Sequence, residues 1–140
     1  MRVLDIGGGW GGVTQYCGTR DIHVTALNMM EDSYELISCL IRESNLPGKV
    51  FLRDFLNYTL TDSYDHAVMF GVIEHISNYR EFSSRVWEIL KPGGRLYLDG
   101  SAAVKKYAVS TFTREYIWTG THTYMTVKML LLRYSTTVSN

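Results

Sequence analysis

Short apolar runs alternate with longer amphipathic stretches along the first 100 residues of the chain. This alternation predicts buried strands connected by helices, the pattern of a parallel sheet that is covered on both faces. The expected strands are residues 3–6, 22–27, 49–53, 65–70 and 95–99. The expected helices are residues 10–16, a second helix that begins at Glu31, and residues 78–90.

Right-handed crossover connections would arrange the five strands in the order 3-2-1-4-5. The predicted fold class is therefore α/β, a doubly wound and mainly parallel sheet with helices on both faces. Ligands of such sheets bind at the carboxyl ends of the strands, where the winding reverses. We expect the site at the carboxyl ends of the first, second and fourth strands.

The turn after the first strand holds five glycines within six positions. Gly7, Gly9 and Gly12 satisfy the pattern G-x-G-x-x-G, which alone would indicate a dinucleotide site. Asp5 precedes the first glycine by two residues, and its carboxylate would repel a pyrophosphate at the start of the next helix. The same carboxylate would help to hold the ammonium and sulfonium of S-adenosylmethionine. We therefore expect a site for this cofactor, and an Asp that merely caps the turn is the alternative.

Composition narrows the possible partners. Fourteen basic and fourteen acidic side chains leave a net charge of zero, which does not suggest binding to nucleic acid or to an anionic membrane surface. The sequence has no signal peptide and no apolar run of spanning length, so we expect a cytoplasmic protein without an integral membrane segment. Its histidines lack metal-ligand spacing, so no metal is expected. Cys17 and Cys39 fall in expected helices and are predicted to be reduced thiols.

Three segments together resemble the class I methyltransferases that use S-adenosylmethionine. They are residues 5–12, the pair Glu74-His75, and residues 90–94, which read Leu-Lys-Pro-Gly-Gly. The Trp-Gly-Gly ending of the glycine turn and residues 112–118 are similar to the group of cyclopropane-fatty-acid synthases and mycolic acid cyclopropane synthases. The resemblance implies a Rossmann-like fold and methyl transfer to a small, hydrophobic or lipid acceptor.

The same resemblance implies which residues hold the cofactor. They are Asp5, Gly7, Gly8, Gly9, Asn28, Met29, Asp54, Phe55, Phe70 and Gly71. The first strand and its glycines would face the methionine part, and the end of the fourth strand would pass nearby. Asn28 and Met29 would lie near the ribose, where many methyltransferases have an acid. Asp54 would accept from the adenine amino group with Phe55 beside the ring, although a turn cap is the alternative for Asp54.

Glu74 and His75 are the predicted catalytic residues. In the cyclopropane synthase group the matching Glu belongs to a bicarbonate site that removes a proton from a carbocation. Asp99 stands where that group has a His, and an acid would repel bicarbonate, so a substrate-facing or structural Glu-His pair is the favoured interpretation. If the acceptor must lose a proton, the general base would be Glu74, His75 or Asp99.

Residues 1–100 would form the cofactor-binding core, and residues 101–140 a partial lid over the substrate with a truncated C-terminus. The antiparallel hairpin that ends class I methyltransferases is apparently missing. The fifth strand would then be an exposed edge and would allow self-association. The aromatic side chains of the lid favour a hydrophobic acceptor, or else they pack on further parts of the chain. An NAD-binding oxidoreductase and a non-catalytic methyltransferase fragment remain alternative hypotheses.

Overall fold

The computed structural model describes residues 1–100, so the lid, the missing hairpin and the other predictions for residues 101–140 lie outside the described residues. Five parallel strands form one sheet in the order β3-β2-β1-β4-β5. The strands are β1 (Arg2–Ile6), β2 (His23–Asn28), β3 (Gly48–Leu52), β4 (Tyr64–Met69) and β5 (Leu90–Leu98). The predicted strand order and α/β class are confirmed.

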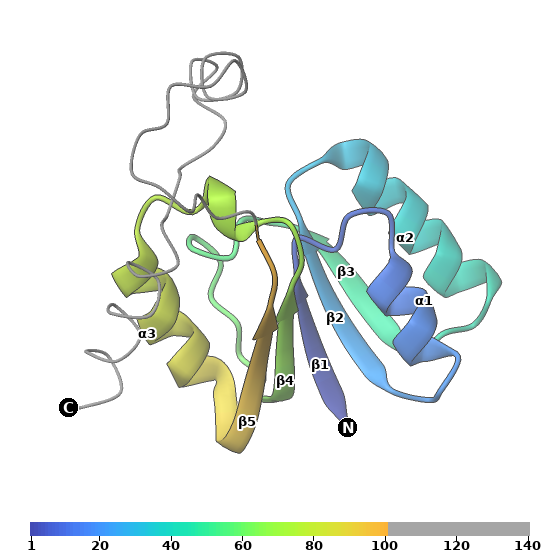
Figure 1. The fold of residues 1–140 in the computed structure, drawn as a ribbon. Helices are drawn as coiled ribbons and strands as arrows, with labels where there is room; N and C mark the ends of the chain where they lie inside the picture. The colour runs from blue at the N-terminus through green and yellow to red at the C-terminus, as the bar shows by residue number, and fades with distance from the viewer. Residues whose placement is uncertain (101–140) are drawn as a thin grey trace.

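Helices lie on both faces of this sheet (Figure 1). They are α1 (Gly12–Gly18), α2 (Glu31–Glu43) and α3 (Tyr79–Ile89), with a short 3₁₀ turn, η1 (Ile73–His75), before α3. Helices α1 and α2 cover one face, and α3 covers the other face beside β4 and β5 (Figure 1). Asn78 is the N-cap of α3, and its side chain accepts from the backbone N–H of Glu81 at 3.2 Å.

Alternation along β1 sends neighbouring side chains to opposite faces of the sheet. Leu4 and Ile6 join the larger core cluster, which includes Phe82 of α3. Val3 instead packs with Cys17 of α1 in a second cluster on the other face. Asp5 shares the face of Val3, so the carboxylate of this buried strand points toward the α1 side.

Strand β5 is longer than the sequence predicts. The expected turn at residues 91–94 lies inside the strand as an irregularity, because Leu90 pairs with Tyr64 whereas the next pairing joins Arg95 to His66. Pro92 has no N–H to donate to a neighbouring strand, and Gly93 adopts a φ of +80°. The Pro-Gly-Gly sequence thus bends β5 without ending it.

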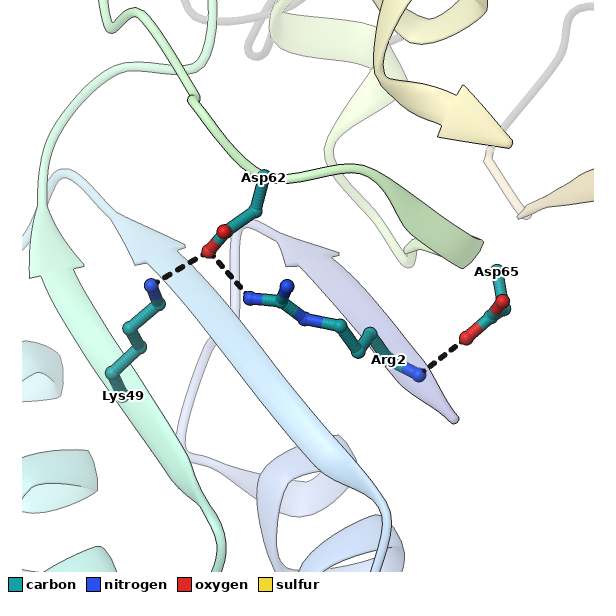
Figure 2. A network of polar contacts seen from close by, with 4 residues as sticks. All are labelled: Arg2, Lys49, Asp62 and Asp65. Atoms are coloured by element: carbon teal, nitrogen blue, oxygen red, sulfur yellow. Dashed lines mark hydrogen bonds and ion pairs between the residues drawn. The ribbon is translucent and has the colours of Figure 1, made fainter.

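An ion-pair network joins the strands at the amino edge of the sheet, opposite the glycine turn (Figure 2). Asp62 accepts from Lys49 at the start of β3 and from the guanidinium of Arg2 in β1, at 2.8 and 2.5 Å. The backbone N–H of Arg2 donates to Asp65 at 2.6 Å, and Lys91 pairs with the same carboxylate at 2.7 Å. Four strands are therefore tied together at this edge.

Candidate cofactor and acceptor site

The glycine turn between β1 and α1 is built on positive backbone angles. Gly7, Gly9 and Gly11 have φ values of +78°, +50° and +84°, a region that favours glycine over any L-residue. The N–H groups of Gly7 and Gly8 both donate to the carbonyl of Leu27 in β2, at 2.9 and 3.0 Å. The turn is therefore fixed to the carboxyl end of the neighbouring strand.

Asp5 lies directly beneath this turn. Its residue exposure is 2%, and a Cβ added at Gly8 would stand 3.2 Å from its Oδ2 atom. Within the described part of the chain, Oδ2 has no hydrogen-bond partner. Burial raises the pKa of Asp5 from 3.8 to about 7. A buried and unsatisfied carboxyl group is costly, so a cationic ligand group at the turn would suit it.

Asn28 links the turn to the start of α2. Its side-chain amide donates to the carbonyl of Gly9 at 3.1 Å, and its Oδ1 accepts from the N–H groups of Met29 and Met30 at 2.9 and 3.2 Å. These contacts occupy most of the hydrogen-bonding capacity of Asn28, which is 7% exposed. Its predicted place near a ribose stays a prediction. The side chain of Met29 is 73% exposed at the same edge.

Asp54 and Phe55 follow β3 and are engaged in protein contacts. The carboxylate of Asp54 accepts from the N–H of Leu56 at 3.0 Å and from the amide of Asn57 at 2.6 Å, as in a turn cap. Phe55 is 3% exposed and meets Phe82 edge to face, with ring centroids 5.6 Å apart. Their predicted contacts with an adenine ring remain untested, and the observed contacts are structural.

The loop after β4 packs against the glycine turn through Val72. Phe70 is half exposed, and Gly71 has a φ of +63°. Val72 lies against Gly7 so closely that a Cβ added at Gly7 would overlap the Cγ2 atom of Val72. The two loops therefore fit together through the missing side chain of Gly7.

Glu74 and His75 lie in η1, at the same edge of the sheet. Glu74 is 8% exposed, whereas His75 is exposed. A Cβ added at Gly100 would stand 3.4 Å from Oε1 of Glu74, so the chain leaving β5 passes beside this carboxylate. Asp99 is thereby brought to the same region. The sequence identified Asp99 as a departure from the family and as a possible base. It did not predict that the carboxylate of Asp99 accepts from the backbone N–H of Gly71.

The carboxyl ends of β1, β2 and β4 thus gather most of the predicted residues (Figure 1). In residues 1–100, no group of three or more His, Cys, Asp or Glu side chains could hold a metal ion. No helix in this same part of the chain is long and apolar enough to cross a membrane. The candidate site is therefore a glycine turn above the buried carboxyl group of Asp5, with Glu74 in η1 after β4 at the same edge of the sheet.

Solved structures define the class of this fold. Phosphoethanolamine N-methyltransferase 2 of Haemonchus contortus has a TM-score of 0.88 and 20% identity, over 98% of this chain and 32% of its own. A cyclopropane synthase of Mycobacterium tuberculosis has a TM-score of 0.83 and 22% identity, over 98% of this chain and 54% of its own. The fold is that of the Rossmann-like methyltransferases.

The family model of mycolic acid cyclopropane synthetase matches residues 1–130, and the chain belongs to this family. It is 33% identical over 97 residues to cyclopropane-fatty-acyl-phospholipid synthase of Escherichia coli, covering 67% of this chain and 24% of that protein. It is 27% identical over 134 residues to ubiquinone biosynthesis O-methyltransferase of Rickettsia akari, covering 93% of this chain and 53% of that protein. The predicted resemblance is confirmed, and the chain spans about half or less of these relatives.

Proposed function

We propose that this chain binds S-adenosylmethionine at the glycine turn and transfers its methyl group to a small, hydrophobic or lipid acceptor. The observation that carries the proposal is the buried Oδ2 of Asp5, which has no partner in the described residues and lies beneath Gly8. The ammonium and sulfonium of the cofactor would compensate the negative charge of this carboxylate. The pyrophosphate of NAD would instead increase the free-energy cost of burying that charge. The family membership supports the same choice.

Residues at the carboxyl edge would share the work of holding this cofactor. The backbone of Gly7 and Gly9 would allow the methionine part to approach closely, because neither carries a side chain. Phe70 and Gly71 would border the methionine part from the other loop. Met29, which is exposed beside the end of β2, would border the ribose.

The chemistry asks little of the protein beyond placement. When bound, S-adenosylmethionine supplies a methyl group that is already activated by its sulfonium. The protein would orient donor and acceptor in line, exclude water and, where the acceptor must lose a proton, accept it. Glu74 is the best-placed base, because it is buried at the same edge as the glycine turn.

The names of two relatives support a lipid acceptor for this proposal. One relative is named for fatty acyl phospholipids, and another is named for the biosynthesis of ubiquinone. Coclaurine N-methyltransferase, which was solved with N-methylheliamine, has a TM-score of 0.82 at 23% identity and shows the same fold. As part of this proposal, we place the activity in cytoplasmic lipid metabolism.

Calorimetric titration tests the cofactor. We expect wild-type protein to bind S-adenosylhomocysteine, and Asp5→Asn to bind it at least tenfold more weakly because the compensating charge is lost. Glu35→Gln, on the exposed face of α2, is the matched control and should bind like wild type. Binding of NADH without binding of S-adenosylhomocysteine would overturn the proposal in favour of the oxidoreductase.

Transfer of a labelled methyl group tests the reaction. The label is supplied on S-adenosylmethionine, and vesicles with unsaturated acyl chains are compared with a phenol and an amine. Label in the lipid supports the proposed acceptor, and mass spectrometry of the lipid separates methylation from cyclopropanation. Cofactor binding with no transfer to any acceptor would favour the non-catalytic fragment.

Self-association is a further part of the proposal. Among the described residues, β5 stands at the end of the strand order and pairs with β4 alone. A strand with one unpaired edge can pair with a second copy. Light scattering after gel filtration should therefore give the mass of a dimer, and a monomer mass at micromolar concentration would contradict this.

A further inference from the structure

The carboxylate of Asp99 holds the loop that follows β4. Its Oδ1 atom accepts from the backbone N–H of Gly71 at 2.7 Å, and the N–H of Asp99 donates to the carbonyl of Met69 at 3.1 Å. The two bonds lie on either side of Phe70, which is half exposed. The end of β5 therefore fixes the point at which the chain leaves β4.

The backbone turns sharply at the residue that Asp99 holds. Gly71 has a φ of +63°, a conformation that residues with a side chain rarely adopt, and a Cβ added there would meet nothing within 4 Å. Because glycine has many accessible backbone conformations, a hydrogen bond to its N–H helps to keep it in one of them. The carboxylate of Asp99 supplies such a hydrogen bond to the N–H of Gly71.

The residue after Gly71 packs against the glycine turn, so the position of Gly71 affects that contact. Val72 follows Gly71 and lies against Gly7, where a Cβ would overlap its Cγ2 atom. Gly7 itself is fixed by its bond to Leu27 at 2.9 Å. A shift of Gly71 would therefore move Val72 either away from the turn or into it.

The same loop also positions Glu74. The carbonyl of Val72 accepts from the N–H of His75 at 2.9 Å, which closes the first turn of η1. On the other side, Gly100 lies against Ile73 and Glu74, with no room for a side chain at Gly100. The segment from Asp99 to Gly100 therefore contacts the loop that carries Glu74 at two places, at Gly71 by a hydrogen bond and at Ile73 and Glu74 by close packing.

We propose that Asp99 is a positioning residue, which sets the loop from Phe70 to Glu74 against the glycine turn and so controls affinity for the cofactor. This inference rests on the proposed function, because the cofactor is the ligand whose binding it would control. Asp99 acts through the N–H of Gly71 and not by touching the reacting atoms. What it supplies is a hydrogen-bond acceptor at a fixed place.

Two variants separate the effect of the hydrogen-bond acceptor oxygen of Asp99 from the effect of its negative charge. Asp99→Asn keeps an oxygen that can accept from Gly71, whereas Asp99→Ala removes it. We expect Asp99→Ala to weaken the binding of S-adenosylhomocysteine about tenfold, as a lost hydrogen bond to a charged group predicts. We expect Asp99→Asn to stay within about threefold of wild type. Glu88→Ala, at an exposed position of α3, is the matched control.

Amide hydrogen exchange of Gly71, followed by NMR in the protein without ligand, provides a second measurement. The N–H of Gly71 should be protected in wild type and in Asp99→Asn, and should exchange at least tenfold faster in Asp99→Ala. Thermal unfolding followed by circular dichroism checks that each variant is folded. If Asp99→Ala fails to fold, Asp99→Asn still tests the acceptor role. Protection of Gly71 and affinity within about threefold of wild type are expected in this variant, and a larger loss of either would overturn the role.

The outcomes distinguish this inference from the function on which it rests. Unchanged affinity in Asp99→Ala with fast exchange at Gly71 would overturn control of the cofactor. Equal losses of affinity in Asp99→Asn and Asp99→Ala would show that charge matters and would overturn the acceptor role. If wild type binds no S-adenosylhomocysteine, the proposed function fails together with the control of affinity, and exchange at Gly71 alone decides whether Asp99 holds the loop.

Discussion

The side-chain amide of Asn28 donates a hydrogen bond to the carbonyl oxygen of Gly9 across 3.1 Å. This bond joins the end of β2 to the middle of the glycine turn. The Oδ1 atom of the same side chain accepts from the N–H groups of Met29 and Met30, the two residues that precede α2. A carboxylate could accept at the helix but could not donate to Gly9. The geometry therefore explains why an amide, and not an acid, ends β2 in this chain.

Replacing this amide by an acid should weaken the turn. In Asn28→Asp the donor to Gly9 is lost, and a negative charge faces the carbonyl oxygen instead. We expect unfolding in urea to require about 1 to 2 kcal/mol less free energy, and S-adenosylhomocysteine to bind more weakly. Gln15→Glu, which adds a negative charge at an exposed position of α1, should change neither quantity. A more stable Asn28→Asp protein would show that the bond to Gly9 contributes nothing.

Asp5 should make stability fall as the pH rises. Burial raises its pKa from 3.8 to about 7, so the folded protein binds a proton more tightly than the unfolded chain between these values. The free energy of unfolding should therefore drop between pH 5 and pH 8, by about 2 to 3 kcal/mol for this group. Urea titrations at both pH values should show this drop in wild type, and a drop smaller by that amount in Asp5→Asn. Equal pH dependence in both proteins would contradict the raised pKa.

Binding of the cofactor should release a proton near neutral pH. A cation at the glycine turn favours the charged form of Asp5 and so lowers its raised pKa. Titrations of S-adenosylhomocysteine at pH 6 in buffers of different ionisation enthalpy should report the release of up to one proton, which Asp5→Asn should abolish. A heat of binding that is independent of the buffer would mean that Asp5 does not sense the ligand.

The steric fit between Gly7 and Val72 predicts a loss of stability when Gly7 gains a side chain. Gly7→Ala places a Cβ at a positive φ and against Val72, so we expect a loss of at least about 1 to 2 kcal/mol in the free energy of unfolding. Gly12→Ala is the control, because a Cβ there meets nothing within 4 Å at the start of α1. It should be neutral or slightly stabilising. Adding Val72→Ala to Gly7→Ala should recover the steric part of the loss and leave the backbone part.

The network at the amino edge predicts a loss of stability in acid. Hydrogen bonds from Lys49 and Arg2 hold the pKa of Asp62 below its ordinary value, so its contribution is present at neutral pH and is lost as the pH falls through the folded-state pKa. Asp62→Asn should lower the melting temperature by a few degrees at pH 7 and by less at 1 M salt. Glu35→Gln, at an exposed position beyond the first turn of α2, is the comparison. An effect that persists unchanged at high salt would mean that charge is not the cause.

The sequence by itself determined the order and type of the elements. Strands and helices follow from apolar periodicity over a few residues, and the glycine turn from the backbone angles that glycine permits. The parallel order then follows from crossover handedness, which places the carboxyl ends of β1, β2 and β4 together. Asp5 was predicted from its place just before the glycines, and its lack of a partner fits that prediction.

The tertiary structure decided which polar groups meet. The bonds from Asn28 to Gly9 and from Gly71 to Asp99 join residues 19 and 28 positions apart, and the bond from Arg2 to Asp65 spans 63 positions. No local pattern specifies such pairs, because they depend on how loops from different strands pack at one edge. The raised pKa of Asp5 has the same origin, since burial by surrounding elements sets it. The sequence thus predicted where the site lies, and packing decided which contacts each side chain makes there.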